Sequence, residues 1–75
     1  MDSRLVKELK KYPFRKSQEE KIPPYLVYNN KEMFALCEKF PKTLEELGRV
    51  PGFKEDKVKK YGNDLLEIIE KFKDA

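Results

Sequence analysis

A chain of 75 residues provides for one small domain, because a chain of this size buries only about 60% of its unfolded surface. Charged residues make up 41% of the chain and hydrophobic residues 39%, and the interspersed signs favour a solvated helical surface over disorder. The net charge of +3 arises in residues 1–30, which hold seven Lys or Arg against four Asp or Glu. This mild excess excludes the dense basic stripe of a dedicated duplex binder, so any affinity for a polyanion should be modest and salt-sensitive.

Enzymatic activity is the function class that the sequence supports least. The chain has no histidine, so its one cysteine, Cys37, lacks the base that would activate it as a nucleophile. No GxxxxGK[ST] phosphate loop occurs, and the carboxylates are spread among lysines rather than clustered for two metals. We therefore expect a non-catalytic domain that needs no metal and no cofactor.

The expected compartment follows from the cysteine and from hydropathy. A single cysteine among apolar residues predicts a small buried side chain, and it fits a reducing compartment. No apolar run approaches the roughly 18 residues of a membrane span. The N-terminal residues also lack the apolar stretch of a signal peptide. We expect a cytoplasmic protein with no membrane partner, monomeric in isolation.

The first predicted helix contains a proline. Leu5, Leu9 and Tyr12 recur at helical spacing. Pro13 follows, and inside a helix proline removes one hydrogen bond and clashes with the preceding turn. We expect a kink or a break near Tyr12, with helical structure resuming over Arg15–Lys21.

The segment "IPPYLVY" (22–28) resembles a strand, but no second strand pattern exists to pair with it. Two consecutive prolines also end any preceding helix. We therefore expect an extended or single-turn segment whose side chains fill the core. For Tyr25 and Tyr28 this core or half-buried role is favoured over stacking on nucleic-acid bases.

Two helix starts carry capping signals. Asn29 is followed three residues later by Glu32, and Thr43 by Glu46, as in capping boxes. The first of these helices should end at Pro41, and the second should be short. The last helix, from about Lys54 to Lys73, is the longest periodic segment, with apolar residues three and four apart: Val58, Tyr61, Leu65, Ile68, Ile69 and Phe72.

Between the last two helices, Pro51 and Gly52 form a corner like that of a helix-hairpin-helix. Gly52 can adopt the positive φ that turns the chain. The free N–H groups of the next helix would then form an anion site that grips phosphate without reading bases. The competing interpretation is a purely structural corner, because Glu55 and Asp56 would repel a nearby phosphate.

The order of these features resembles that of the HRDC domain, the helicase-and-RNase-D C-terminal module. The resemblance runs from about Leu5 to Ile69 and rests on "PPYLVYNN", "FP", "TLEEL", "VPGF" and "KYG" in this order. It implies an all-α, compact single-domain bundle of four to five short helices over residues 1–75. It also implies an accessory, non-catalytic module of RecQ-type helicases or of RNase D. Lys54 stands where members often have a second glycine, and Pro13 where they commonly have an arginine.

Two functions follow as alternatives. In the first, the domain binds single-stranded or junction DNA weakly and without sequence preference, with RNA as a further ligand of the family. In the second, it contacts the rest of its parent helicase or a partner protein, which the balanced charge beyond residue 30 favours. The candidate nucleic-acid-binding residues are those near the first proline and around the corner: Arg15, Lys16, Arg49, Gly52, Lys54, Lys57 and Lys60.

Overall fold

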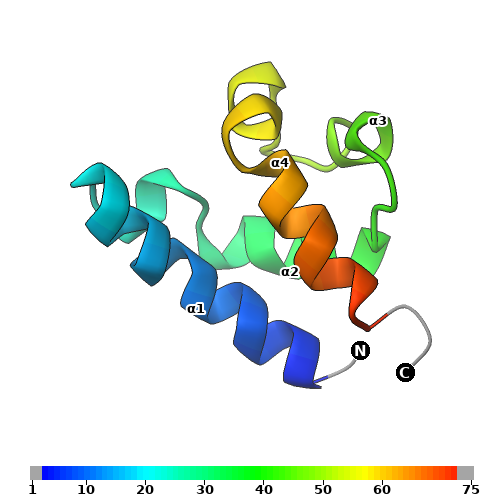
Figure 1. Cartoon of the computed structure of the whole chain (residues 1–75). Helices are drawn as coiled ribbons and strands as arrows, with labels where there is room; N and C mark the ends of the chain where they lie inside the picture. The colour runs from blue at the N-terminus through cyan, green and yellow to red at the C-terminus, as the bar shows by residue number, and fades with distance from the viewer. Residues whose placement is uncertain (1–2, 73–75) are drawn as a thin grey trace.

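The computed structural model describes residues 3–72, which form helices and turns without a strand. Figure 1 shows α1 in front of α2, with α4 packed beside α3. The all-α class and the compact bundle are confirmed. No helix within residues 3–72 is long and apolar enough to cross a membrane. The elements in chain order are α1 (Ser3–Glu20), the 3₁₀ turn η1 (Pro24–Leu26), α2 (Asn30–Lys39), α3 (Leu44–Leu47) and α4 (Glu55–Glu70).

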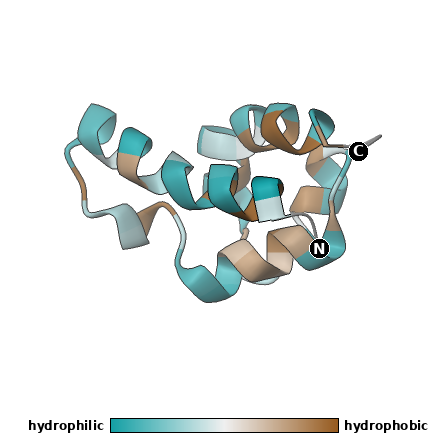
Figure 2. Ribbon diagram, turned by 90° about the horizontal axis from the view of Figure 1, so that it is seen from below, coloured by the Kyte–Doolittle hydropathy of each residue, from teal (hydrophilic) through white to brown (hydrophobic). Residues whose placement is uncertain are grey.

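One hydrophobic core receives side chains from every α-helix. Figure 2 shows hydrophilic and hydrophobic residues alternating along the long helices, as expected for amphipathic helices that share a core. Cys37 is buried on α2, as its apolar neighbours predicted. The side chains with the least exposure are Leu9, Val27, Leu36, Leu47 and Leu65.

Four aromatic rings connect the helices within this core. The rings of Tyr12 and Tyr28 are stacked with centroids 6.3 Å apart, and Tyr61 meets Tyr12 edge-on at 6.3 Å. Phe53, which follows the Pro-Gly corner, lies 5.8 Å from Tyr28. Such contacts add about 0.5–1.5 kcal/mol beyond the area they bury. The cluster therefore fixes the corner relative to α1.

Of the kink or break expected near Tyr12, the break is wrong, because α1 continues through Pro13 to Glu20. Proline has no N–H to donate to the carbonyl of Leu9, four residues earlier. In this structure the buried hydroxyl of Tyr28 donates to that carbonyl oxygen at 2.5 Å. A side chain from another segment thus replaces the backbone bond that Pro13 removes.

The end of α1 places a lysine in a conformation that favours glycine. Lys21 has a φ of 58°, and the next residue, Ile22, donates its N–H to the carbonyl of Ser17 at 3.1 Å. Left-handed backbone costs a non-glycine residue about 1–2 kcal/mol.

Lys21→Gly should therefore stabilise the fold by about 1 kcal/mol, measured as a higher urea midpoint. The matched control is Lys7→Gly, inside α1, which should destabilise by about 1 kcal/mol because glycine is a poor helix former. Equal losses for both variants would contradict the strain at Lys21.

The predicted capping signals are confirmed in part. Asn29 and Glu32 form the complete, reciprocal capping box at the start of α2. At the start of α3, the hydroxyl of Thr43 accepts from the N–H of Glu46. The Glu46 carboxylate, however, accepts from the backbone N–H of Lys42 and not from that of Thr43. The last helix, α4, begins after Lys54 and ends earlier than expected, at Glu70; Lys73, the predicted end, lies outside the described residues.

Candidate nucleic-acid interface

The corner between α3 and α4 is a tight turn. The N–H of Phe53 donates to the carbonyl of Val50 at 3.0 Å, and Gly52 has a φ of 91°. Proline followed by a glycine of positive φ is the pattern of a type II turn. The hairpin predicted from Pro51 and Gly52 is therefore present, and Gly52 makes the turn.

The lysines around this hairpin differ in whether a carboxylate compensates their charge. The ammonium group of Lys57 is 3.2 Å from both carboxylate oxygens of Glu32. It also lies 5.8 Å from the centroid of the Phe53 ring. Lys54 and Lys60 are exposed and form no ion pair with the described residues. Two of the three predicted hairpin lysines therefore present an uncompensated charge.

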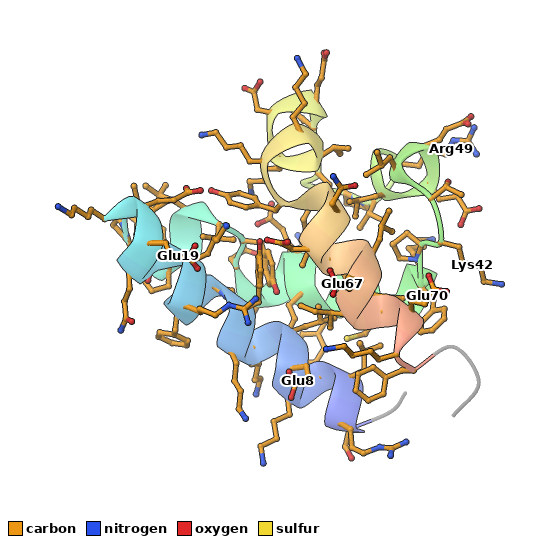
Figure 3. The ribbon with its side chains drawn as sticks, in the orientation of Figure 1. Glu8, Glu19, Lys42, Arg49, Glu67 and Glu70 are labelled. Atoms are coloured by element: carbon orange, nitrogen blue, oxygen red, sulfur yellow. The ribbon has the colours of Figure 1, made fainter. Side chains whose placement is uncertain are left out.

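The predicted cations on α1 and just after α3 already have partners. Lys16 has a side chain only 20% exposed and lies 3.6 Å from Asp64 of α4. The guanidinium of Arg15 lies 5.2 Å from the centroid of the Tyr12 ring. Arg49, which projects from the α3 side of the molecule in Figure 3, pairs with Glu45 at 2.8 Å. The seven predicted residues therefore do not form one surface, because Arg15 and Arg49 line separate depressions.

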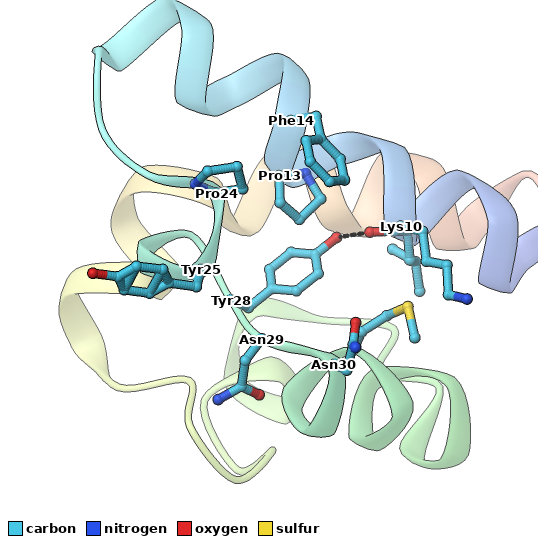
Figure 4. A pocket seen from close by; sticks show the side chains of 10 residues that line it. Lys10, Pro13, Phe14, Pro24, Tyr25, Tyr28, Asn29 and Asn30 are labelled. Atoms are coloured by element: carbon cyan, nitrogen blue, oxygen red, sulfur yellow. Dashed lines mark hydrogen bonds between the residues drawn. The ribbon is translucent and has the colours of Figure 1, made fainter.

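A different surface combines aromatic side chains with a lysine. We call it the aromatic groove, a depression of about 440 Å³ between α1, η1 and the start of α2. Figure 4 shows Phe14 and Tyr25 on two sides of Tyr28, which forms the floor. Phe14 is 63% exposed and Tyr25 is 64% exposed, whereas Tyr28 is 3% exposed. The groove is lined by Leu9, Lys10, Pro13, Phe14, Pro24, Tyr25, Tyr28, Asn29, Asn30 and Met33.

The charge of the lining distinguishes this groove from the other large depressions. No carboxylate lines the aromatic groove, and Lys10 contributes one cation. Between α1 and α4, a depression of about 400 Å³ is lined by three carboxylates, of which Figure 3 labels Glu8 and Glu67, and by as many cations. Beside the hairpin, the lining includes the carboxylates of Glu32 and Glu38 and one cation, Lys31. Of these three depressions, the aromatic groove is therefore the one whose lining carries a net positive charge.

The floor of the groove is buried and stays uncharged. Burial raises the pKa of Tyr28 above its ordinary value, so the hydroxyl keeps its proton and continues to donate to the carbonyl of Leu9.

Outside the groove, burial and the hydrogen bond to Glu20 also raise the pKa of Tyr61, to about 12. No three His, Cys, Asp or Glu side chains within residues 3–72 are grouped to hold a metal ion.

Sequence reasoning missed the aromatic groove for a specific reason. The prediction for Tyr28 is confirmed, but the core or half-buried role predicted for Tyr25 is wrong, because η1 turns that ring outward. A helix that breaks at Pro13 gives Phe14 no defined face, so the sequence interpretation passes over it. In a continuous helix Phe14 falls on the same face as Lys7 and Lys10, and a large aromatic residue on a polar face is a detectable signal.

Comparison with known proteins places this fold in a family. The family model described as "HRDC domain" matches residues 2–69. Over 69 residues the chain is 28% identical to the ATP-dependent DNA helicase UvrD2 of Mycobacterium bovis and, equally, to UvrD2 of Mycobacterium tuberculosis. The match covers 92% of this chain but only 10% of each helicase. No solved structure matches the chain. Since the family model spans most of the sequence, the chain belongs to the HRDC domain family.

Proposed function

We propose that this domain is a non-catalytic accessory module of an ATP-dependent DNA helicase and that it binds single-stranded DNA weakly, without sequence preference. The aromatic groove carries this proposal. Binders of single strands combine positive charge with aromatic rings on which bases of any sequence stack. Phe14, Tyr25 and Lys10 supply both elements on one surface that no carboxylate lines.

The cations predicted from the sequence are proposed to contact the phosphates on either side of the stacked bases. Lys54 and Lys60 are free to do so. Arg15 would have to give up only its contact with the Tyr12 ring. Arg49 would give up an exposed ion pair, at about 0–1 kcal/mol. Lys16 and Lys57 are proposed as weaker contacts, because their side chains are only 20% and 26% exposed and each is paired with a carboxylate. These contacts carry no sequence information, and they make the affinity depend on salt.

The same proposal includes the kind of parent protein and the choice of DNA over RNA. The resemblance implies RecQ-type helicases or RNase D, and the relatives found by comparison are UvrD2 helicases, of which this chain spans about a tenth. Because these relatives are DNA helicases, we propose single-stranded or junction DNA as the ligand. Parallel titrations with oligo(dT) and oligo(U) test this choice, because equal affinities would contradict a preference for DNA.

Substitution in the groove tests the proposed function directly. Tyr25→Ala should weaken oligo(dT) binding by roughly 5- to 150-fold, because stacking on one ring contributes about 1–3 kcal/mol. Tyr25→Phe, which keeps the ring, should bind nearly as well as the unmodified domain. Filter binding at low and moderate salt measures the affinities.

The matched control is Phe34→Ala, which removes another exposed aromatic ring, one that lies outside the groove. We expect this variant to bind oligo(dT) normally. Equal losses for Phe34→Ala and Tyr25→Ala would contradict a stacking site at the groove, as would binding that does not weaken with salt.

A contact with the parent helicase is the second candidate function. Phe34 and Leu44 are large apolar side chains that are 45% and 44% exposed. The depressions whose linings mix carboxylates with cations also suit a protein surface better than a polyanion. If oligo(dT) produced no amide shifts at all, this second function would account for the domain.

A further inference from the structure

The side chain of Glu32 packs against Gly52 of the Pro-Gly hairpin. Glu32 belongs to the first turn of α2, and its side chain is 17% exposed. One of its carboxylate oxygens accepts from the N–H of Asn29 at 2.9 Å, and both oxygens are 3.2 Å from the ammonium group of Lys57. A Cβ atom built on Gly52 would overlap the other oxygen, so the carboxylate packs directly against the glycine.

This position sets the charge of the hairpin. Lys57 is the hairpin lysine with the least exposed side chain, at 26%, and Glu32 compensates its charge. The first turn of α4 adds two carboxylates, Glu55 and Asp56. The positive end of α4 is therefore already matched by negative side chains, and a phosphate group would add charge of the same sign.

We propose that Glu32 is a selectivity residue, which keeps nucleic-acid phosphate away from Lys57 and from the backbone amides beside Gly52. Stacking is then confined to the aromatic groove, and on the hairpin side only the exposed Lys54 and Lys60 reach phosphates. Its carboxylate packs against Gly52 and pairs with Lys57 at the same time, so a phosphate that approached Lys57 would meet a charge of its own sign. This inference rests on the proposed function, since it determines which of two surfaces the strand uses. It would also explain how a chain with a helix-hairpin-helix-like corner withholds the amides of that corner from a polyanion.

Glu32→Gln tests the proposal while preserving the fold. Glutamine can still accept from the N–H of Asn29, so the capping box remains, but the charge that compensates Lys57 is lost. In an NMR titration of the whole chain with oligo(dT), the variant should show new amide shifts over residues 52–58 in addition to those at the groove. Binding should tighten by about twofold to fivefold at low salt, which is the range for one exposed charge pair.

The control for net charge is Glu70→Gln, at the other end of α4. It removes the same charge far from Gly52 and should produce no new shifts at the hairpin. If Glu32→Gln and Glu70→Gln tighten binding equally and neither changes the hairpin amides, the proposal is overturned. Glu32→Asp keeps the charge but moves it away from Gly52. It should give new amide shifts at the hairpin that are smaller than those of Glu32→Gln.

A titration with inorganic phosphate separates this proposal from the proposed function. Phosphate should shift the amides of residues 52–58 in Glu32→Gln but not in the unmodified chain. If oligo(dT) fails to bind the groove and phosphate still gives this difference, the proposed function fails and the role of Glu32 is supported. If phosphate leaves both hairpins unchanged, the role of Glu32 is refuted whatever the groove binds.

Discussion

Gly52→Ala should destabilise the domain by about 2–3 kcal/mol, which lowers the melting temperature by about 4–8 °C per kcal/mol in a domain of this size. The positive φ of 91° accounts for about 1–2 kcal/mol of this loss, because a Cβ atom is disfavoured there. The remainder comes from Glu32, whose Cγ and Cδ atoms would both lie 2.7 Å from the new methyl group. The side chain would have to leave its position, with loss of its bond to Asn29 and its pairing with Lys57.

Gly48→Ala is the matched control for this prediction. Gly48 has a φ of −64°, and an added Cβ atom would meet its nearest neighbour at 3.5 Å, an ordinary contact. This variant should be neutral or slightly stabilising. Thermal unfolding followed by circular dichroism measures both, and equal melting temperatures would refute the strain assigned to Gly52.

The steric part of the stability loss in Gly52→Ala can be isolated by making the same substitution in a variant that lacks the Glu32 side chain. In Glu32→Ala, the methyl group of Gly52→Ala no longer meets a carboxylate. The additional cost of Gly52→Ala should then fall to about 1–2 kcal/mol, the part due to φ alone. An unchanged cost in this background would show that Glu32 does not pack against the glycine.

Tyr28→Phe should destabilise the domain by about 1–3 kcal/mol, although it removes only one oxygen atom. The hydroxyl is the replacement partner of the Leu9 carbonyl, and without it a buried acceptor is left unpaired. In the Pro13→Ala background, the introduced alanine supplies the backbone N–H that proline lacks. The cost of Tyr28→Phe should therefore be much smaller there, and a double-mutant cycle measures the difference.

Tyr61→Phe serves as the control for hydroxyl removal. The hydroxyl of Tyr61 donates to the carboxylate of Glu20, an exposed residue that water can solvate in its place. We expect this variant to lose less free energy of unfolding than Tyr28→Phe, measured by urea denaturation. An additive cycle for Pro13→Ala and Tyr28→Phe would contradict the coupling between the two residues.

Features that depend on neighbouring residues could be predicted from the sequence. Asn29 and Glu32 are three residues apart, so their capping box follows from local geometry alone. The periodic apolar residues of α4 and the Pro51-Gly52 turn are likewise local. The order of these features also identified the HRDC family, which the family model confirms.

Features that depend on contacts between distant residues could not be predicted in this way. The helix continues through Pro13 because Tyr28, fifteen positions later, reaches the Leu9 carbonyl. The same contact keeps Phe14 on the helix and so creates one side of the aromatic groove. Glu32 and Lys57 are 25 positions apart, and only the packing of α2 against the hairpin shows that the lysine is already paired.

The bond between Tyr28 and Leu9 also restricts the order in which related chains can diverge. A chain that first exchanges Pro13 for another helix former regains its backbone bond and can afterwards accept phenylalanine at position 28. A chain that loses the tyrosine hydroxyl first must pass through a less stable intermediate. We expect descendants of this sequence to vary at position 28 mainly after proline has disappeared from position 13.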